Sequence, residues 1–275
     1  MITNPTIGMY GQLGNQLFQY AFLYGQCLRL RRRAFINANN PGFDLHPYHI
    51  TAAGTISVVS ANRYRDRFER EIVADWPERS FLNSDELAWG PDSCAYSGYF
   101  QSPNYFIDCA DAVRRIVQPR TDLPASAAHW ERLIERSSQP VVGIHVRLGD
   151  YLTIPTIFTN LQTTHYYERA LSFFRLVLPG GFLPLIFSDD IGWCETSGLF
   201  TELEAAHFVE GLDKFSDLRL LSLCDHHVVA NSSFSWWGAW LASHESQVVL
   251  APKQWFGPAG FPDWGTIYPA GWTIL

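Results

Sequence analysis

Short runs of β-branched and other apolar residues alternate along the chain with stretches whose apolar positions recur at helical spacing. In the first such stretch Leu17, Ala21, Tyr24 and Leu28 fall at i, i+4, i+7 and i+11, which places them on one stripe of a helix. Strands that alternate with amphipathic helices are typical of an α/β fold with a parallel sheet. The pattern therefore predicts an α/β architecture.

The amino-terminal part of the chain is predicted to contain a strand–turn–helix unit followed by a second strand. The first strand is expected near Thr6–Tyr10, the helix from about Gln16, and the second strand over Ala34–Asn37. From about residue 38 to residue 120 the chain is richer in Gly, Pro, Asn and Asp. These residues favour turns, so the pattern predicts no clear element there.

The alternation is sharper in the carboxyl-terminal part. Pro119 and Pro140 flank a short predicted helix, over about 126–137, and such breakers indicate a domain boundary. We therefore expect two α/β domains, 1–135 and 136–275. Strands are predicted in the second domain over 141–147, 185–187, 207–209, 227–230 and 248–251, and helices over 166–178, 215–224 and 235–242.

The composition excludes several classes of protein. Of the 275 residues 47% are hydrophobic, 15% aromatic and 17% charged. A disordered chain would be poor in aromatics and rich in charge, and neither a coiled coil nor a collagen-like repeat has this composition. The formal net charge is −7. Because dedicated nucleic-acid-binding domains are usually basic, no nucleic-acid partner is expected.

Two arginine clusters run against the acidic balance. They are interpreted either as solvated helix surface or as a patch that faces an anionic membrane or a phosphorylated ligand. The clusters consist of Arg29, Arg31, Arg32 and Arg33, and of Arg63, Arg65, Arg67 and Arg70.

The cysteines and the apolar stretches bear on the cellular compartment. The five cysteines form no CxxC pair, so neither a zinc ribbon nor a disulfide framework is expected. No charged segment followed by an apolar one opens the chain. The most apolar long stretch, 171–187, contains Arg175 and a Pro-Gly-Gly break and is therefore unsuited to span a bilayer. We expect a cytoplasmic protein and leave open a peripheral contact with the inner face of the membrane.

Glycines recur at positions 8, 11 and 14, between the first predicted strand and helix. Glycine lets the backbone approach a ligand closely, and a helix N-terminus offers free N–H groups. The spacing differs from GxGxxG and lacks the Lys-Ser/Thr pair of a P-loop, which disfavours nucleotide dehydrogenases and P-loop NTPases. A ligand-binding loop and a plain tight turn both remain open.

Two charged motifs follow predicted strands of the second domain, where the ligand sites of open α/β sheets lie. In HVRLGDY, at 145–151, Arg147 can direct two N–H groups onto a phosphate and Asp150 can accept a proton. The alternative is a surface Arg–Asp pair beside a core His145. In FSDD, at 187–190, the two acids could hold a metal, bind the edge of a base or ribose, or cap the next helix.

A hydroxyl-rich turn follows another predicted strand. NSSFSWWG, at 231–238, places three serines and one asparagine at a helix N-terminus, which suits a pyrophosphate. A helix cap needs only one such residue. Asp225-His226-His227 also suggests metal ligands, but His227 is interpreted more simply as the start of a buried strand, and no metal site is expected.

In this order the motifs resemble the bacterial α-1,2-fucosyltransferase family (glycosyltransferase family 11). The resemblance runs from Gly11 to the closing Gly271-Trp272 and is carried by GQLGNQLFQYA, HVRLGDY, FSDD followed by IGWC, ANSSFSWWGAWL and APKQWF. It implies a GT-B fold: two Rossmann-like domains with the active site in the cleft between them. It also implies metal-independent transfer, with inversion, of L-fucose from GDP-β-L-fucose to a hydroxyl, usually O2, of a terminal β-galactoside in a lipopolysaccharide or exopolysaccharide glycan.

The resemblance also implies roles for individual residues. Arg147 would hold the β-phosphate as it leaves, and His145 would lie near the nucleoside. Asp189 or Asp190 would serve the guanine and ribose side. The loop against the pyrophosphate would consist of Asn231, Ser232, Ser233, Phe234 and Ser235.

Three further points concern the acceptor side and the catalytic motif. Gly11, Gly14 and Asn15 match a turn on the acceptor side. Relatives commonly read HVRRGDY, whereas Leu148 replaces the second arginine and leaves one side-chain cation in this motif. For the base that takes the acceptor proton, Asp150 is the candidate, and the alternative is a dissociative transition state that needs no strong base.

Other functions remain open from the sequence. One is a fucosyltransferase of different linkage, or a transferase that uses another GDP-sugar such as GDP-mannose. Another is a sugar-nucleotide or carbohydrate-binding protein without turnover, which would not need Arg147 as a leaving-group clamp. A metal-dependent phosphoesterase would rest on the acidic pair at 189–190 and the Asp-His-His run at 225–227. The sequence specifies neither the natural acceptor nor the oligomeric state.

Overall fold

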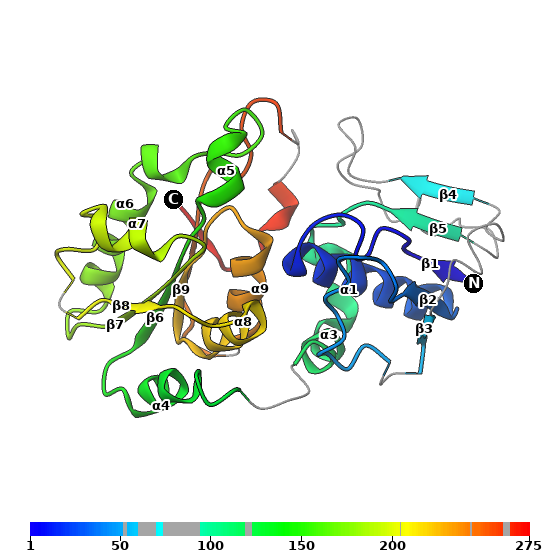
Figure 1. The fold of residues 1–275 in the computed structure, drawn as a ribbon, viewed down its shortest axis with the longest axis horizontal. Coiled ribbons are helices and arrows are strands. Elements are labelled where there is room, and N and C mark those ends of the chain that lie inside the picture. Colours follow the sequence, from blue (N-terminus) through cyan, green and yellow to red (C-terminus); the bar gives the residue numbers. More distant parts are fainter. Residues whose placement is uncertain are drawn as a thin grey trace. The chain divides into compact units, whose positions relative to one another are not determined.

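The chain is described from a computed structural model, which describes residues 1–51, 54–59, 70–73, 94–118, 123–203, 205–242, 244–260 and 265–275. It divides into two α/β units (Figure 1). The first unit comprises 1–121 and 261–268, and the second comprises 122–260 and 269–275. Of the two arginine clusters, positions 63, 65 and 67 lie outside the described residues.

The division between the units falls earlier in the chain than the expected boundary at 135/136. Helix α4 (Ala128–Arg136) packs against α8 (Lys214–Leu223) and so belongs to the second unit. A segment from near the carboxyl terminus belongs to the first unit, where the Ser102 hydroxyl donates a hydrogen bond to the Thr266 carbonyl over 2.9 Å. The sequence pattern shows the breakers around α4 but not the packing that assigns it to one side.

The first unit is built on a parallel sheet in the order β3-β2-β1-β5-β4. Its strands are β1 (Ile2–Thr3), β2 (Ala34–Asn37), β3 (Ile56–Val59), β4 (Arg70–Val73) and β5 (Cys94–Ser97). The prediction of β2 is confirmed at both ends. The weakly patterned region from 38 to 120 contributes β3, β4 and β5 and, after them, helix α3 (Ala110–Ile116).

The predicted first strand is wrong in position. Residues 6–10 form turns, and β1 lies four residues earlier. The Asn4 side chain accepts hydrogen bonds from the backbone N–H and the hydroxyl of Thr6, which closes an Asx turn directly after the strand. Gly8 then adopts a φ of 79°, a value that glycine tolerates best. Short-range polar contacts therefore end β1 before the segment 6–10, in which the strand was predicted.

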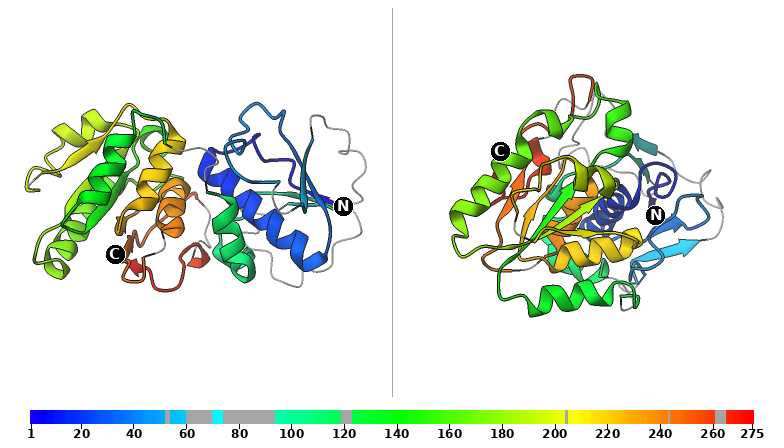
Figure 2. Two further views of the ribbon diagram at one scale, coloured as in Figure 1. Left: turned by 90° about the horizontal axis from the view of Figure 1, so that it is seen from below. Right: turned by 60° about the vertical axis from the view of Figure 1, so that its left-hand side comes forward.

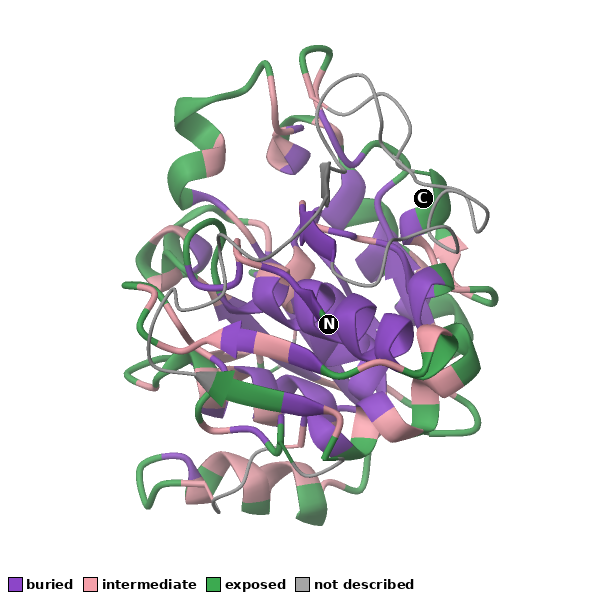
Figure 3. Ribbon diagram, turned by 90° about the vertical axis from the view of Figure 1, so that its right-hand side faces the viewer, coloured by how far each residue is buried: buried purple, intermediate pink, exposed green. Residues whose placement is uncertain are grey.

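Helix α1 (Leu13–Leu30) forms the core of the first unit, as Figure 3 shows by its almost continuous buried surface. Leu17, Ala21 and Tyr24 of the predicted stripe are buried, whereas Leu28, near the end of the helix, is 44% exposed. Phe22 stacks on Phe100 with ring centroids 3.7 Å apart. Because α1 is covered on almost all sides, its sequence is apolar well beyond one stripe.

The second unit contains a six-stranded parallel sheet in the order β11-β10-β9-β6-β7-β8. All the strands predicted here are confirmed to within two residues at each end, and β11 is additional. The strands are β6 (Val141–Val146), β7 (Leu183–Ser188), β8 (His207–Val209), β9 (His226–Val228), β10 (Val249–Ala251) and β11 (Thr273–Ile274).

Helices cover both faces of this sheet (Figure 2). Alternate residues of β6 and β7 enter two separate apolar clusters, one with α6 (Tyr166–Val177) and α7 (Ile191–Thr196) and the other with α4 and α8. On the second face Leu221 lies so close to Gly238 that a Cβ there would meet the leucine side chain at 2.4 Å. The remaining helices are α5 (Gly149–Thr153) and α9 (Ser233–Leu241).

None of the helices within the described ranges is long and apolar enough to cross a membrane.

Candidate active site

The predicted site motifs of the second unit meet at one edge of its sheet. Strands β6, β7, β8 and β9 run parallel, so their carboxyl ends lie along the same edge. Arg147 directly follows β6, Asp189 directly follows β7, and the turn after β9 leads into α9. This edge is where open α/β sheets bind ligands.

Arg147 lies between two carboxylates. Its Nη1 is 3.2 Å from Oδ2 of Asp189, and its Nη2 forms an ion pair with Oδ1 of Asp150. The Arg147 side chain is 17% exposed, that of Asp189 24% and that of Asp150 56%. The guanidinium carbon also lies 5.3 Å from the ring centre of Tyr151, and this ring stacks on Phe158 at 4.0 Å. The guanidinium is therefore held at a fixed place while one of its carboxylate partners remains accessible to solvent.

The turn after β6 fixes Asp189 from the other side. The backbone N–H of Leu148 donates to Oδ1 of Asp189 over 2.9 Å. At Gly149 a Cβ would meet Oδ2 of Asp189 at 2.3 Å, so only glycine leaves room for this contact. Leu148 itself is 1% exposed and belongs to the apolar core. Leucine at this position therefore packs the core, and Arg147 is the residue of the turn that meets the carboxylates.

His145 is a neutral, buried group at the end of β6. Burial, assisted by the charge of Arg147, lowers the pKa of His145 to about 3. Its ring lies 5.5 Å from the ring of Phe234, which belongs to the first turn of α9. Its Nδ1 has no hydrogen-bond partner among the described residues. A buried polar atom without a partner is costly, so this nitrogen is suited to meet a polar atom of a ligand.

Most polar side chains of the β9–α9 turn hold the turn itself. Asn231 donates from Nδ2 to the carbonyls of Thr159 and Trp255, both over 2.9 Å. The Ser232 hydroxyl caps α9 by accepting from the N–H of Phe234. The Ser235 hydroxyl donates to the Ser232 carbonyl and accepts from the N–H of Ala230. What this turn offers a ligand is therefore the start of α9, with its backbone N–H groups and positive dipole end.

Asp189 and Asp190, the two acids after β7, make different contacts. Asp189 contacts the Arg147 turn, whereas Asp190 accepts from the N–H of Trp193 over 2.9 Å and caps α7. The helix-capping interpretation thus describes the Asp190 side chain in this structure.

The Asp-His-His run is used in packing at the opposite end of β9. Asp225 accepts from the N–H of Val141, and His226 accepts from that of Val248. His227 contacts the Leu221 carbonyl through Nε2, and burial lowers the pKa of His227 to about 4. Within the described ranges no three His, Cys, Asp or Glu residues are grouped so that they could hold a metal ion.

A further acidic residue, which the sequence motifs did not indicate, lies in the first turn of α8. Burial, and secondarily the Asp213 carboxylate, raises the pKa of Asp217 to about 7. Its Oδ1 has no partner among the described residues. Because α8 follows β8, it begins at the same sheet edge as α9, and both helices pack against each other. Polar residues recur every few positions in 213–222. In the sequence alone, Asp217 therefore looks like an ordinary solvent-exposed residue.

The glycine-rich turn lies in the first unit. Gly11 adopts a φ of 76° before α1, whereas Gly14 is a buried residue in the first turn of the helix. Asn15 accepts a hydrogen bond from Nε2 of Gln101 over 2.6 Å. The turn is further fixed by Gln16, which donates from Nε2 to the Gly42 carbonyl. The role of Gly11, Gly14 and Asn15 at an acceptor stays a prediction.

Comparison with known proteins gives concordant matches. The model of the family "Glycosyl transferase family 11" matches residues 2–275. An alpha-1,2-colitosyltransferase of Escherichia coli is 28% identical over 274 residues, which cover 90% of this chain and 90% of that protein. The O-antigen biosynthesis glycosyltransferase WbnK of Escherichia coli is 28% identical over 284 residues, covering 90% and 93%.

A solved structure agrees in fold. The structure of an Arabidopsis thaliana FUT1 mutant in complex with GDP matches with a TM-score of 0.55 and 13% identity, covering 90% of this chain and 69% of that chain. Together with the two parallel sheets, this likeness establishes the GT-B fold.

Proposed function

The chain belongs to glycosyl transferase family 11, the α-1,2-fucosyltransferase family, and on this premise we propose that it transfers L-fucose from GDP-β-L-fucose to O2 of a terminal β-galactoside, with inversion. The observation that carries the proposal is the guanidinium of Arg147, held at the carboxyl edge of the sheet, where α9 also begins. A diphosphate leaving group needs both features, a forked cation and a set of backbone N–H groups.

The guanine base of the donor is the proposed partner of Asp217 and His145. Guanine presents neighbouring N–H donors at N1 and N2, and a carboxylate with a free oxygen can accept both. Asp217 is a part-buried carboxyl group whose Oδ1 has no described partner, and the same is true of Nδ1 of His145. The Phe234 ring beside His145 offers the base an aromatic edge. A carboxylate, an unpartnered ring nitrogen and an aromatic ring together favour a purine base over an acceptor sugar as the ligand of these three residues.

In the proposed step the acceptor O2 attacks C1 of fucose while the bond from C1 to the β-phosphate oxygen breaks. The electron pair of that bond leaves with GDP, and positive charge develops on the fucose ring. Arg147 and the start of α9 stabilise the charge that builds on the diphosphate, a contribution that preorganised groups make most strongly in the transition state. The proton of the O2 hydroxyl passes to a carboxylate, for which Asp150 is the candidate.

The resting ion pair suggests how Asp150 becomes available. A bound diphosphate competes with carboxylates for the Arg147 guanidinium. Asp189 is fixed by the Leu148 N–H and mostly buried, whereas Asp150 is 56% exposed. The diphosphate would therefore displace Asp150, and the released carboxylate can accept the acceptor proton. On this account the donor binds before the base is free.

A second donor sugar has a specific observation in its favour. The Escherichia coli relative is named as a colitosyltransferase, and colitose differs from L-fucose only in lacking the 3-hydroxyl. The groups proposed above contact the nucleotide and the phosphates, so they would accept either donor. GDP-colitose is therefore the alternative to GDP-fucose.

Donor and linkage are tested together. Purified protein is given GDP-fucose, GDP-colitose or GDP-mannose at equal concentration with lactose, and initial rates are followed by the release of GDP. The disaccharide-derived product is then isolated and its linkage determined by NMR. The proposal expects GDP-fucose to be the fastest of the three donors and the new linkage to be α to galactose O2. A preference for GDP-colitose would move the assignment to the alternative, and linkage to another hydroxyl would overturn the proposed regiochemistry.

A further inference from the structure

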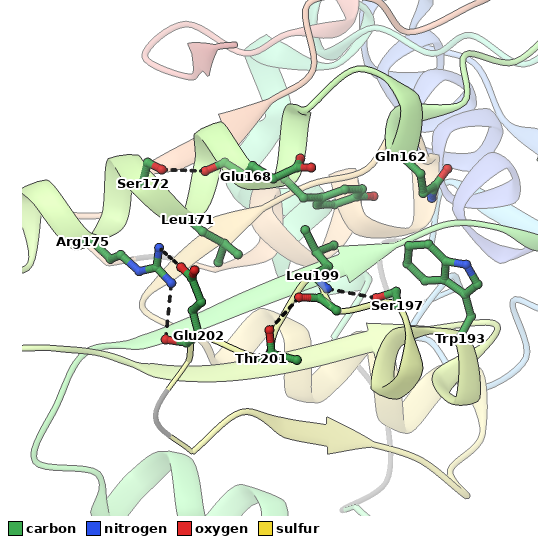
Figure 4. A pocket seen from close by; sticks show the side chains of 12 residues that line it. Gln162, Glu168, Leu171, Ser172, Arg175, Trp193, Ser197, Leu199, Thr201 and Glu202 are labelled. Atoms are coloured by element: carbon green, nitrogen blue, oxygen red, sulfur yellow. Dashed lines mark hydrogen bonds and ion pairs between the residues drawn. The ribbon is translucent and has the colours of Figure 1, made fainter.

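A concave site that the proposed chemistry does not use lies between α6 and the segment from α7 to residue 202. This α6–α7 groove has a volume of about 520 Å³. Figure 4 shows Trp193 and Gln162 at one end and Arg175 with Glu202 at the other. Its lining consists of Gln162, Tyr167, Glu168, Leu171, Ser172, Arg175, Trp193, Ser197, Gly198, Leu199, Thr201 and Glu202.

The charge of the groove disfavours an anionic ligand. Glu168 and Glu202 outnumber Arg175, the basic residue of the lining. The Arg175 guanidinium is also engaged: its Nη1 lies 3.2 Å from Oε2 of Glu202, and its Nη2 donates to the Glu202 carbonyl over 3.3 Å. A phosphate or a second nucleotide would meet net negative charge here, because the lining has two carboxylates and one guanidinium.

The polar atoms of the groove are mostly acceptors. The Ser172 hydroxyl donates to the carbonyl of Glu168, and the Thr201 hydroxyl donates to that of Gly198, each over 2.8 Å. Each oxygen keeps lone pairs that can accept. The Glu168 and Glu202 side chains, which are 51% and 80% exposed, add carboxylate oxygens. The groove therefore fits a ligand rich in O–H donors.

The apolar part of the lining fits the same kind of ligand. The indole of Trp193 is partly buried against the core and lines the groove with the side chains of Leu171 and Leu199. An aromatic face at one end of the groove and hydroxyl-accepting groups along the rest of it match a glycan of pyranose units, each of which has an apolar C–H face and a rim of hydroxyls. A purely apolar ligand would leave the carboxylates without partners, which is costly.

We infer that the α6–α7 groove is a second carbohydrate-binding subsite that takes neutral pyranose units of the glycan acceptor. It is connected with the site at the sheet edge through two side chains of its lining. Gln162 donates from Nε2 to the Arg147 carbonyl over 3.3 Å, and the Tyr167 hydroxyl donates to the His145 carbonyl over 3.1 Å. The inference deepens the proposed function, because it adds a binding subsite remote from the reacting hydroxyl.

A site-specific binding measurement tests the inference without turnover. In ¹H–¹⁵N spectra of the whole chain saturated with GDP, the indole signal that disappears in Trp193→Phe identifies Trp193, and the one lost in Trp130→Phe identifies the control on α4. Lacto-N-neotetraose and lactose are then titrated. The inference expects a saturable shift of the Trp193 signal with the tetrasaccharide and none of the Trp130 signal. An unchanged Trp193 signal up to several millimolar sugar overturns it.

A kinetic measurement separates this inference from the proposed function. Trp193→Ala should raise KM for the tetrasaccharide on the order of tenfold, equivalent to about 1.4 kcal/mol, while kcat and the KM for lactose stay unchanged. Trp130→Ala should leave all of these values as in the wild type. Normal kinetics of Trp193→Ala on both acceptors would overturn the subsite while leaving the transfer reaction intact. Absence of transfer by the wild type would overturn the proposed function, and the spectra would still decide on the groove.

Discussion

Arg147 meets two carboxylates that differ in how firmly they are held. Asp189 accepts a backbone N–H and is mostly buried, whereas Asp150 is bound to Arg147 and otherwise exposed. An exposed ion pair contributes little stability and can be exchanged for a stronger anion. We therefore expect a bound diphosphate to take the place of Asp150 on the Arg147 guanidinium.

Replacement of Arg147 should remove charge stabilisation that matters most in the transition state. We expect Arg147→Ala to lower kcat on the order of a hundred- to a thousandfold, about 2.7–4 kcal/mol, as measured by the initial rate of GDP release. Arg114→Ala is the matched control, because Arg114 is paired with the aspartate three residues before it, Asp111, on α3 of the first unit. A rate within threefold of the wild type for Arg147→Ala would contradict the assigned role.

Replacement of Asp150 by asparagine should lower the rate of transfer but strengthen the binding of GDP. In Asp150→Asn the guanidinium loses its competing charge, so we expect GDP to bind more tightly. The loss of a proton acceptor should lower kcat on the order of a hundredfold, at the low end for general bases. Calorimetric titration with GDP and initial rates with lactose check the two effects. Weaker GDP binding by the variant would contradict the displacement of Asp150.

If Asp217 binds the guanine base as proposed, donor binding should depend on pH. Burial raises the pKa of Asp217 to about 7, and the guanine N–H groups favour the charged carboxylate, so donor binding releases a proton. The affinity for GDP should therefore fall as pH decreases through about 7, by at most tenfold per pH unit for one proton. Because the β-phosphate also titrates, Asp217→Asn is the comparison: its affinity should be lower at pH 8 and less dependent on pH. Equal pH profiles for the two proteins would contradict the assignment.

The sequence indicated Arg147 and Asp189 because motif chemistry and position after a strand coincided, and His145 because it belongs to the same motif as Arg147. The sequence did not show which of the two acids caps α7 and which contacts the Arg147 turn, because either acid at a strand end fits either role. In the structure Asp190 caps α7 and Asp189 contacts the turn. Asp217 was missed because a carboxylate becomes distinctive only through its burial, and burial depends on the packing of α8 against its neighbours.

The turn between β6 and α5 positions the charged groups. Gly149, the first residue of α5, allows Asp189 to approach the turn, since a Cβ at this position would meet Oδ2 of Asp189 at 2.3 Å. The segment is short, and its geometry rests on the hydrogen bond from the Leu148 N–H to the same carboxylate. A change of backbone here should act on catalysis through Asp189 and Arg147.

Gly149→Ala is expected to displace Asp189 and thereby Arg147. Because misplacement of a catalytic group by about 1 Å can cost on the order of a hundredfold, kcat/KM should fall by about ten- to a hundredfold, with an unchanged circular dichroism spectrum. Gly180→Ala is the control, since a Cβ there would meet no atom within 4 Å. Equal kcat/KM values for the two variants would show that the close approach is not needed.

At the level of elements, periodicity predicted the second unit better than the first. The strands and helices after residue 140 bury one face or both, so their apolar runs are continuous and their ends coincide with breakers. In the first unit the Asx turn at Asn4 ended β1 early, and β3 to β5 lie in the stretch from 38 to 120 that is rich in turn-forming residues. Strands in such a stretch depend on their neighbours in the sheet, and a local pattern does not contain that information.

For the whole molecule, the order of strands and helices was sufficient to predict an α/β chain with two units, and the motifs to predict the family. The pattern did not predict that 261–268 belongs with the first unit. That assignment rests on long-range contacts such as the hydrogen bond from Ser102 to Thr266, 164 residues apart. Contacts of this kind leave no periodicity in either segment.

The central claim for the whole molecule is transfer of fucose with charge stabilised by the protein's own groups. The most direct test incubates purified protein with GDP-fucose and lactose, with and without EDTA, and follows the product mass by liquid chromatography and mass spectrometry. The account predicts lactose increased by one deoxyhexose at the same initial rate with EDTA. Loss of the product in EDTA, restored by a divalent cation, would contradict the role given to Arg147 and α9, and absence of product in both conditions would contradict the transfer itself.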